Sequence, residues 1–101
     1  YILKIGKRPL EWIKPETNGI PPCARYNHTM NYYEDGNYII IHGGRNDYSN
    51  DKFSLNDTFI LELKNLDWLR VEIIFDSPKL EVYRRCGHSS IIYGKLIFLK
   101  F

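Results

Sequence analysis

The sequence predicts an all-β chain built from repeated, antiparallel four-stranded units. The first reason is internal repetition, because Arg25-x-x-His28 recurs 60 residues later as Arg85-x-x-His88, and Trp12 recurs 56 residues later as Trp68. Self-similarity at intervals of about 40 to 60 residues is typical of stacked supersecondary units. The second reason is composition, since the eight tyrosines and the many isoleucines suit pleated, half-buried surfaces better than helices. The third is that no segment carries an apolar stripe at helical spacing, so we expect little or no helix.

The first two strands are expected at residues 1–5 and 11–13. Apolar and polar side chains alternate near the start of the chain, as they do in a half-buried strand. Residues 6–9 are expected to turn, because glycine allows unusual φ angles and proline fixes its own. A loop follows over residues 15–22, where several prolines lack the N–H group that a strand ladder needs.

Four further strands are expected at residues 28–33, 38–42, 58–63 and 67–74. Asp35-Gly36 stands at the centre of a polar stretch between the first two, which is a typical hairpin signal. Residues 45–55 are too rich in Asn, Asp and Ser to be buried, so they form a long loop. Lys64-Asn65 marks the turn between the last two strands.

After a loop at residues 76–83 the pattern begins again. Strands are expected at 88–93 and 96–99, joined by a tight turn at Gly94-Lys95. Four short antiparallel strands in each repeated unit are typical of the blades of a β-propeller.

An ordered set of residues makes the resemblance specific. Arg-x-x-His is followed by an apolar strand, Gly-Gly, Asn-Asp, a strand with Leu-x-Leu, and Trp. This order resembles the kelch repeat, and its residues are Arg25, His28, Gly43, Gly44, Asn56, Asp57, Leu61, Leu63 and Trp68. The resemblance covers nearly the whole chain and implies an incomplete β-propeller of kelch blades.

The resemblance divides the chain into one full blade and parts of two neighbours. Residues 25–74 form the complete blade, residues 1–14 the last two strands of a preceding blade, and residues 85–101 the first two strands of a following blade. Inter-blade loops lie at 15–24 and 75–84. One departure is that Lys100-Phe101 stand where the following blade would place Gly-Gly. Both ends read as cuts through strands, so we expect a fragment of a longer protein or a truncated product.

A structural role is expected for the motif residues. Gly43-Gly44 allows positive φ and a close approach of backbones. The two tryptophans are expected to pack between neighbouring blades, and a ring nitrogen of His28 or His88 to bond a backbone group. Asp57 is expected to bond backbone at the start of the third strand, while His42 is ambiguous. The full set is Trp12, Arg25, His28, Gly43, Gly44, Asp57, Trp68, Arg85 and His88.

Binding residues are expected on the loops, because scaffolds carry function on connecting segments. By resemblance, kelch propellers commonly bind proteins or peptides on the face where the inter-blade loops and the loop after Gly-Gly emerge. Arginine offers a planar fork of donors to carboxylates, and tyrosine adds rigid contact area. The expected partner-binding residues are Arg45, Asn46, Asp47, Tyr48, Asn50, Tyr83 and Arg84.

Charge and cysteine usage narrow the classes of partner and location. The net charge of +2 gives no reason to expect nucleic acid or an acidic membrane surface, and the longest apolar runs are too short to span a bilayer. Cys23 and Cys86 occupy nearly equivalent places in the two repeats, which are expected to lie too far apart for a disulfide. With no leader segment visible, we expect reduced thiols and a cytoplasmic protein. The cysteines and histidines show no zinc-binding spacing, so no metal or cofactor is expected.

The function predicted is therefore a non-catalytic protein–protein interaction module that presents loops to a protein or peptide. The alternative is that the chain is part of a kelch-like propeller enzyme, of the copper oxidase or sugar isomerase type. Cys23 lies near Tyr26 and Cys86 near Tyr83, but neither pair has the second histidine that a copper site would need. A truncated remnant without independent function is a further alternative, and open blade edges are expected to permit self-association.

Overall fold

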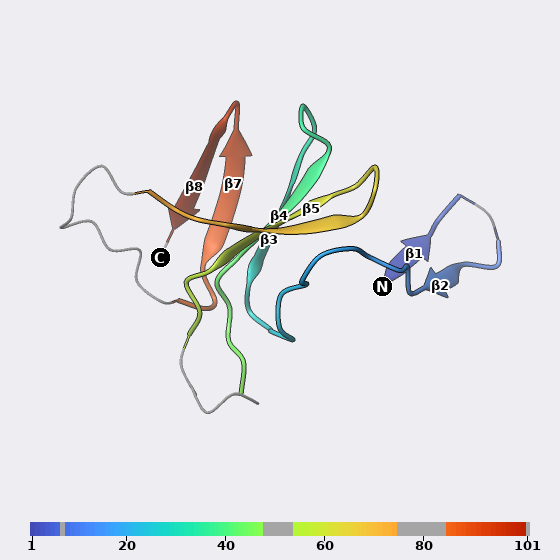
Figure 1. Cartoon of the computed structure of the whole chain (residues 1–101), viewed down its shortest axis with the longest axis horizontal. Coiled ribbons are helices and arrows are strands. Elements are labelled where there is room, and N and C mark those ends of the chain that lie inside the picture. Colours follow the sequence, from blue (N-terminus) through green and yellow to red (C-terminus); the bar gives the residue numbers. More distant parts are fainter. Residues whose placement is uncertain (7, 48–53, 75–84, 101) are drawn as a thin grey trace.

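The structure is a computed structural model, and it describes residues 1–6, 8–47, 54–74 and 85–100 (Figure 1). Within these ranges every regular element is a β-strand, and the strands form three antiparallel sheets. The prediction of an all-β chain is confirmed. No helix in the described ranges is long and apolar enough to cross a membrane.

The central sheet has four strands in chain order. They are β3 (Thr29–Tyr33), β4 (Tyr38–His42), β5 (Thr58–Glu62) and β6 (Asp67–Val71), each antiparallel to the next. The β3–β4 hairpin closes with Asn37 at a φ of 52°, and the Asn37 N–H donates to the Glu34 carbonyl at 3.0 Å. Asparagine tolerates this left-handed conformation, so the turn expected around Asp35-Gly36 forms there.

Two shorter sheets flank the central one in sequence. β1 (Ile2–Lys4) pairs with β2 (Glu11–Ile13), and β7 (Ser89–Tyr93) pairs with β8 (Leu96–Lys100). All eight strands fall at or within one or two residues of the predicted ranges, except that β6 ends at Val71. The division into blades at the predicted boundaries stays a prediction.

The core of the described residues lies between β4 and β5. Ile41 and Phe59 are directly paired across these strands, and both are buried. The guanidinium carbon of Arg25 lies 5.4 Å from the centre of the Phe59 ring, within the range of a cation–π contact. The core therefore ends at a buried charge, on the side where β4 leads into Gly43-Gly44.

The first strands of the two repeats lie side by side. β3 contacts β7, and the Asn31 Nδ2 group donates to the Ser90 carbonyl at 3.4 Å. The Ser90 hydroxyl also donates to Asn31 Oδ1. Repeated segments 60 residues apart in sequence thus form one contact surface, which we call the β3–β7 seam.

The loop before β3 returns to the outer edge of the central sheet. Asn18 donates its N–H to the Leu66 carbonyl, and its carbonyl accepts from the Trp68 N–H, both at 2.9 Å. Its side chain adds a 2.9 Å hydrogen bond to Asp67 Oδ1. We call Asn18-Gly19 with its partners the edge clip.

The two tryptophans have different environments. Trp68 on β6 is half-buried beside the edge clip, whereas Trp12 on β2 is 67% exposed. Among the described residues Trp12 therefore does not pack against another sheet, and its expected place between blades stays a prediction. The reason is that β1 and β2 contact each other and no other described strand, and Figure 1 shows this ribbon standing apart.

Candidate partner-binding surface and its supporting network

Gly43 and Gly44 follow β4, at positions where neighbouring atoms leave no room for a Cβ. Their φ angles are +64° and +99°. A Cβ on Gly43 would lie 2.9 Å from the Arg85 carbonyl oxygen, and one on Gly44 would lie 2.9 Å from the Tyr26 carbonyl oxygen. Both the backbone angles and the contacts therefore require glycine, as the sequence motif indicated.

Arg45 and Leu55, on either side of Gly44's contacts, are held by backbone hydrogen bonds. Arg45 and Tyr26 exchange two of them, at 2.9 Å and 3.0 Å, and the Leu55 N–H donates to the Gly44 carbonyl at 2.7 Å. Arg45 consequently sits beside Tyr26, the residue that follows the motif arginine. This position brings the loop after β4 and the segment before β3 to one surface.

Three side chains on that surface form a connected polar group, which we call the surface triad. The Arg45 Nε group donates to Asp47 Oδ1 at 2.9 Å, and the Tyr26 hydroxyl donates to Asp47 Oδ2 at 2.6 Å. All three residues are exposed. The hydrogen bond to Asp47 raises the pKa of Tyr26, so the phenol remains a donor. Asp47 thus holds Arg45 by Nε in a defined orientation at the surface.

The structure separates the predicted partner-binding residues. Arg45 and Asp47 belong to the surface triad, but Asn46 is only 8% exposed. Asn46 is therefore a support of the loop rather than a contact surface, because alternate residues of an extended segment point in opposite directions. Tyr48, Asn50, Tyr83 and Arg84 lie outside the described residues.

Tyr26 was missing from the predicted site, although a signal for it exists. Its neighbour Arg25 is a motif residue whose side chain points inward to Asp57. In an extended chain the next side chain points to the opposite side. An inward Arg25 therefore predicts an outward Tyr26.

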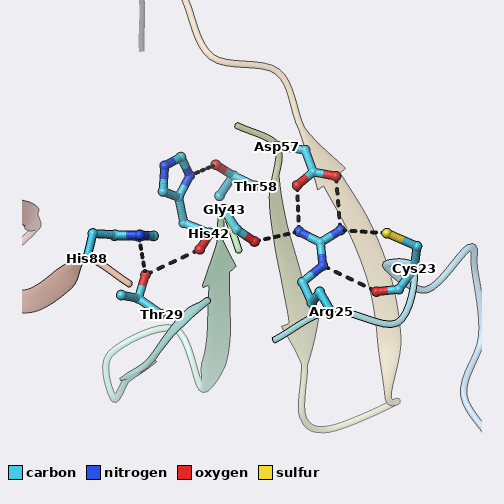
Figure 2. A network of polar contacts seen from close by, with 8 residues as sticks. All are labelled: Cys23, Arg25, Thr29, His42, Gly43, Asp57, Thr58 and His88. Carbon is cyan, nitrogen blue, oxygen red and sulfur yellow. Dashed lines mark hydrogen bonds and ion pairs between the residues drawn. The ribbon is translucent and has the colours of Figure 1, made fainter. Parts of the chain in front are cut away.

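Arg25, which precedes Tyr26 of the triad in sequence, forms an internal ion pair with Asp57 (Figure 2). Arg25 Nη1 and Nη2 donate to the two carboxylate oxygens of Asp57 at 2.5 Å and 3.0 Å, and Nη1 also donates to the Gly43 carbonyl at 3.0 Å. Burial alone would lower the pKa of Arg25, but the hydrogen bond and charge of Asp57 outweigh it and raise the pKa. The guanidinium stays charged inside the fold.

The sequence led us to expect that the side chain of Asp57 bonds backbone, but among the described residues it does not. It pairs with Arg25, while the Asp57 backbone carbonyl accepts from the Gly43 N–H at 3.1 Å. The physical reason is that a buried guanidinium without a charged acceptor costs more free energy than a strand end without a side-chain hydrogen bond.

The histidines lie on the other side of Gly43 (Figure 2). His88 Nε2 forms a hydrogen bond of 3.1 Å with the Thr29 hydroxyl, and His42 Nδ1 one of 2.8 Å with the Thr58 hydroxyl. The His42 and His88 rings meet edge to face with centroids 5.5 Å apart. The bond expected between His88 and backbone is replaced by one to a hydroxyl on the neighbouring strand.

The remaining chemistry of the described residues is limited. Both cysteines are free, and the Cys23 thiol lies 3.5 Å from Arg25 Nη2. No group of three or more His, Cys, Asp or Glu side chains among the described residues could hold a metal ion. The arrangement is a surface arginine on a segment held by backbone hydrogen bonds, close to an internal ion pair.

Comparison with known proteins identifies relatives over most of the chain. Two relatives are Acyl-CoA-binding domain-containing protein 5 of Arabidopsis thaliana, 40% identical over 62 residues, and Acyl-CoA-binding domain-containing protein 6 of Oryza sativa subsp. japonica, 34% identical over 94 residues. These matches cover 61% and 87% of the chain, but only 9% and 13% of the relatives. Dynein regulatory complex subunit 7 of Chlamydomonas reinhardtii is 33% identical over 61 residues, covering 60% of the chain and 5% of that protein.

The chain thus spans a small part of the curated relatives it matches. No solved structure gives a significant match. A family model described as the KLHDC2/KLHL20/DRC7 Kelch-repeats domain matches residues 1–100, which agrees with the repeated motif and with the four-stranded antiparallel sheet. The chain belongs to this kelch-repeat family, and its sheets are blades of an incomplete β-propeller.

Proposed function

We propose that the chain is a non-catalytic module that binds a protein or peptide partner through the surface triad. The observation that carries the proposal is the orientation of Arg45. Its Nε is held by Asp47, and Nε is the only guanidinium nitrogen of Arg45 with a hydrogen-bond partner among the described residues. The terminal nitrogens are therefore available to a ligand.

The chemistry of the triad indicates what the partner offers. A guanidinium held by one edge presents its two terminal nitrogens as a fork, which matches a carboxylate. Tyr26 contributes an exposed ring beside it, and rigid aromatic groups lose little entropy on binding. An acidic side chain flanked by an apolar one on the partner would use both features.

Family membership supports a binding role. Kelch-repeat domains are typically protein-interaction modules, and those of this type are generally non-enzymatic. One relative carries the name of a dynein regulatory complex subunit, which places that protein in an assembly. The partner of the present chain is expected to share the acidic chemistry described above.

The test is a comparison of two arginine variants in binding to displayed peptides. Arg45→Ala removes the fork, whereas Arg70→Ala removes an exposed arginine on β6 outside the triad. We expect acidic peptides selected on the wild-type chain to bind Arg45→Ala at least about tenfold more weakly, equivalent to about 1.4 kcal/mol. Arg70→Ala should bind as the wild type does. Equal binding by all three proteins would contradict the proposal.

A further inference from the structure

All three histidines of the chain lie around Gly43-Gly44, next to the β3–β7 seam. His42 ends β4, His88 precedes β7, and His28 precedes β3. A Cβ on Gly43 would come within 2.9 Å of the His88 ring, and one on Gly44 within 2.8 Å of the His28 Cβ. Imidazoles from two repeats therefore meet in one tightly packed place.

Each of these rings has a buried nitrogen that finds no hydrogen-bond partner among the described residues. The atoms are His28 Nδ1, His42 Nε2 and His88 Nδ1. A neutral imidazole leaves one nitrogen without a proton, and such an atom can be buried at modest cost. An imidazolium would place a charged N–H donor where the described part of the chain offers no acceptor, which costs much more. The packing therefore favours neutral rings.

Taken together, the charged groups around the rings also favour neutral imidazoles. The positive charge of Arg25 acts on His28 and His42, and that of Arg85 acts on His42 and His88, so each imidazole is disfavoured as a cation. Asp57 acts on His42 in the opposite sense, but its carboxylate is bound by Arg25. Burial first, and the neighbouring positive charges second, lower the pKa of all three histidines below the usual 6.5.

The residues around the three histidines also hold the second repeat against the first. The Gly44 N–H donates to the Arg85 carbonyl, and the Gly87 N–H to the Asn27 carbonyl, both at 2.9 Å. The hydrogen bond between His88 and Thr29 adds a side-chain link. Residues 85–88 are thus docked on the complete blade through groups that touch the histidines.

We propose that His28, His42 and His88 form an acid-sensitive latch, which holds residues 85–88 and β7 against the complete blade only while the rings are neutral. Protonation charges the rings, leaves buried donors unpaired, and favours opening of the β3–β7 seam into water. Partner binding through the nearby loop surface would then weaken as the pH falls. This last step rests on the proposed function, whereas the latch itself does not.

The pH range follows from the direction of the shifts. Histidines exposed by opening protonate near pH 6.5, and those in the closed seam protonate only at lower pH. Closure is therefore fully favoured above about pH 7 and is lost progressively as the pH falls through 6.5 toward the lowered pKa values. Each histidine that binds its proton only in the open state changes the opening constant by up to about tenfold per pH unit.

The two cysteines supply a direct readout. Cys86 lies on the docked segment, half-buried, with its thiol 3.4 Å from the Ser54 hydroxyl, whereas Cys23 is exposed. The experiment labels the 101-residue chain with dithiodipyridine at pH 7.5 and pH 5.5 and measures the rate at each cysteine by mass spectrometry. The ratio of the Cys86 rate to the Cys23 rate corrects for the pH dependence that the two thiols have in common.

We expect this ratio to rise at least about tenfold between pH 7.5 and 5.5 in the wild type. In the double variant His42→Gln/His88→Gln, whose side chains do not titrate, the rise should be largely abolished. A constant ratio in the wild type, or an equal rise in the variant, would overturn the latch. Loss of the β-sheet circular dichroism over the same pH range would also overturn it, because the whole fold would then be opening.

A second measurement covers the case in which the double variant does not fold. The chain has only three histidines, so their Cε1–H signals in a proton–carbon NMR spectrum can be followed individually by pH titration. Midpoints below 6.5 for all three support the latch, and a midpoint at or above 6.5 for His42 or His88 overturns it. Neither result depends on a binding partner, so a failed latch and a failed binding proposal can be told apart.

Discussion

The Arg25 side chain connects three parts of the chain that are distant in sequence. It binds Asp57 before β5, the Gly43 carbonyl after β4, and the Cys23 carbonyl in its own segment. The side chains of Arg25 and Asp57 are only 4% and 17% exposed. Removing one partner of a buried ion pair leaves the other charge uncompensated, which costs far more than the pair contributes as a whole.

Arg25→Ala is therefore expected to lower the free energy of unfolding by about 3 to 5 kcal/mol. Chemical denaturation followed by circular dichroism measures the change. Lys64→Ala, at an exposed turn position, is the control and should stay within about 0.5 kcal/mol of the wild type. The double variant Arg25→Met/Asp57→Leu, which removes both charges, should recover much of the loss. A cost below about 1 kcal/mol for Arg25→Ala would show that the pair does not anchor the loop.

At the scale of the element, the edge clip shows how a loop covers the unpaired edge of a strand. Asn18 pairs with the exposed side of β6, so part of that edge is covered by the chain itself. Gly19 follows at a φ of +75°, and a Cβ there would lie 2.5 Å from the Trp68 carbonyl oxygen. Gly87 has a similar φ of +65° with open space around it. Alanine substitutions at these two glycines therefore distinguish the cost of backbone strain from the cost of steric overlap.

Gly87→Ala is expected to cost about 1 to 2 kcal/mol, because only the left-handed backbone is strained. Gly19→Ala should cost clearly more, because a backbone atom must also move. Denaturation gives the costs, and hydrogen exchange at the Trp68 N–H reports whether the clip has detached. If Gly19→Ala and Gly87→Ala cost the same and the Trp68 amide stays protected, the edge clip can shift without losing its hydrogen bonds.

Sequence reasoning succeeded for the strands because their signals are local. The hairpin at Asp35-Gly36 and the turn at Gly94-Lys95 each lie between alternating segments, so neighbouring residues define the element. The site was predicted less completely because its contacts are not local. Arg25 and Asp57 are 32 residues apart, and Thr29 and His88 are 59 apart. A motif shows that such residues belong together, but not which atoms meet.

At the scale of the whole molecule, the described residues bury little apolar surface. Ile41 and Phe59 are the only buried hydrophobic residues among them. One face of the β7–β8 hairpin is apolar and exposed, because Ile91 lies opposite Phe98 and Tyr93 opposite Leu96. A small core and an open apolar face together favour association between chains.

We expect the isolated 101-residue chain to self-associate at micromolar concentrations through this hairpin face. Sedimentation velocity across a concentration series should show species larger than the monomer. Phe98→Lys places a charge in the centre of the face and should shift the chain toward monomer. Ile74→Lys, at a highly exposed position outside the strands, changes hydrophobicity in the same way and should leave association unchanged. A wild-type chain that stays monomeric throughout and melts cooperatively would show that the few buried residues are sufficient to stabilise the monomer. Association is favoured only when the free energy gained by covering the apolar face exceeds the entropy lost on binding.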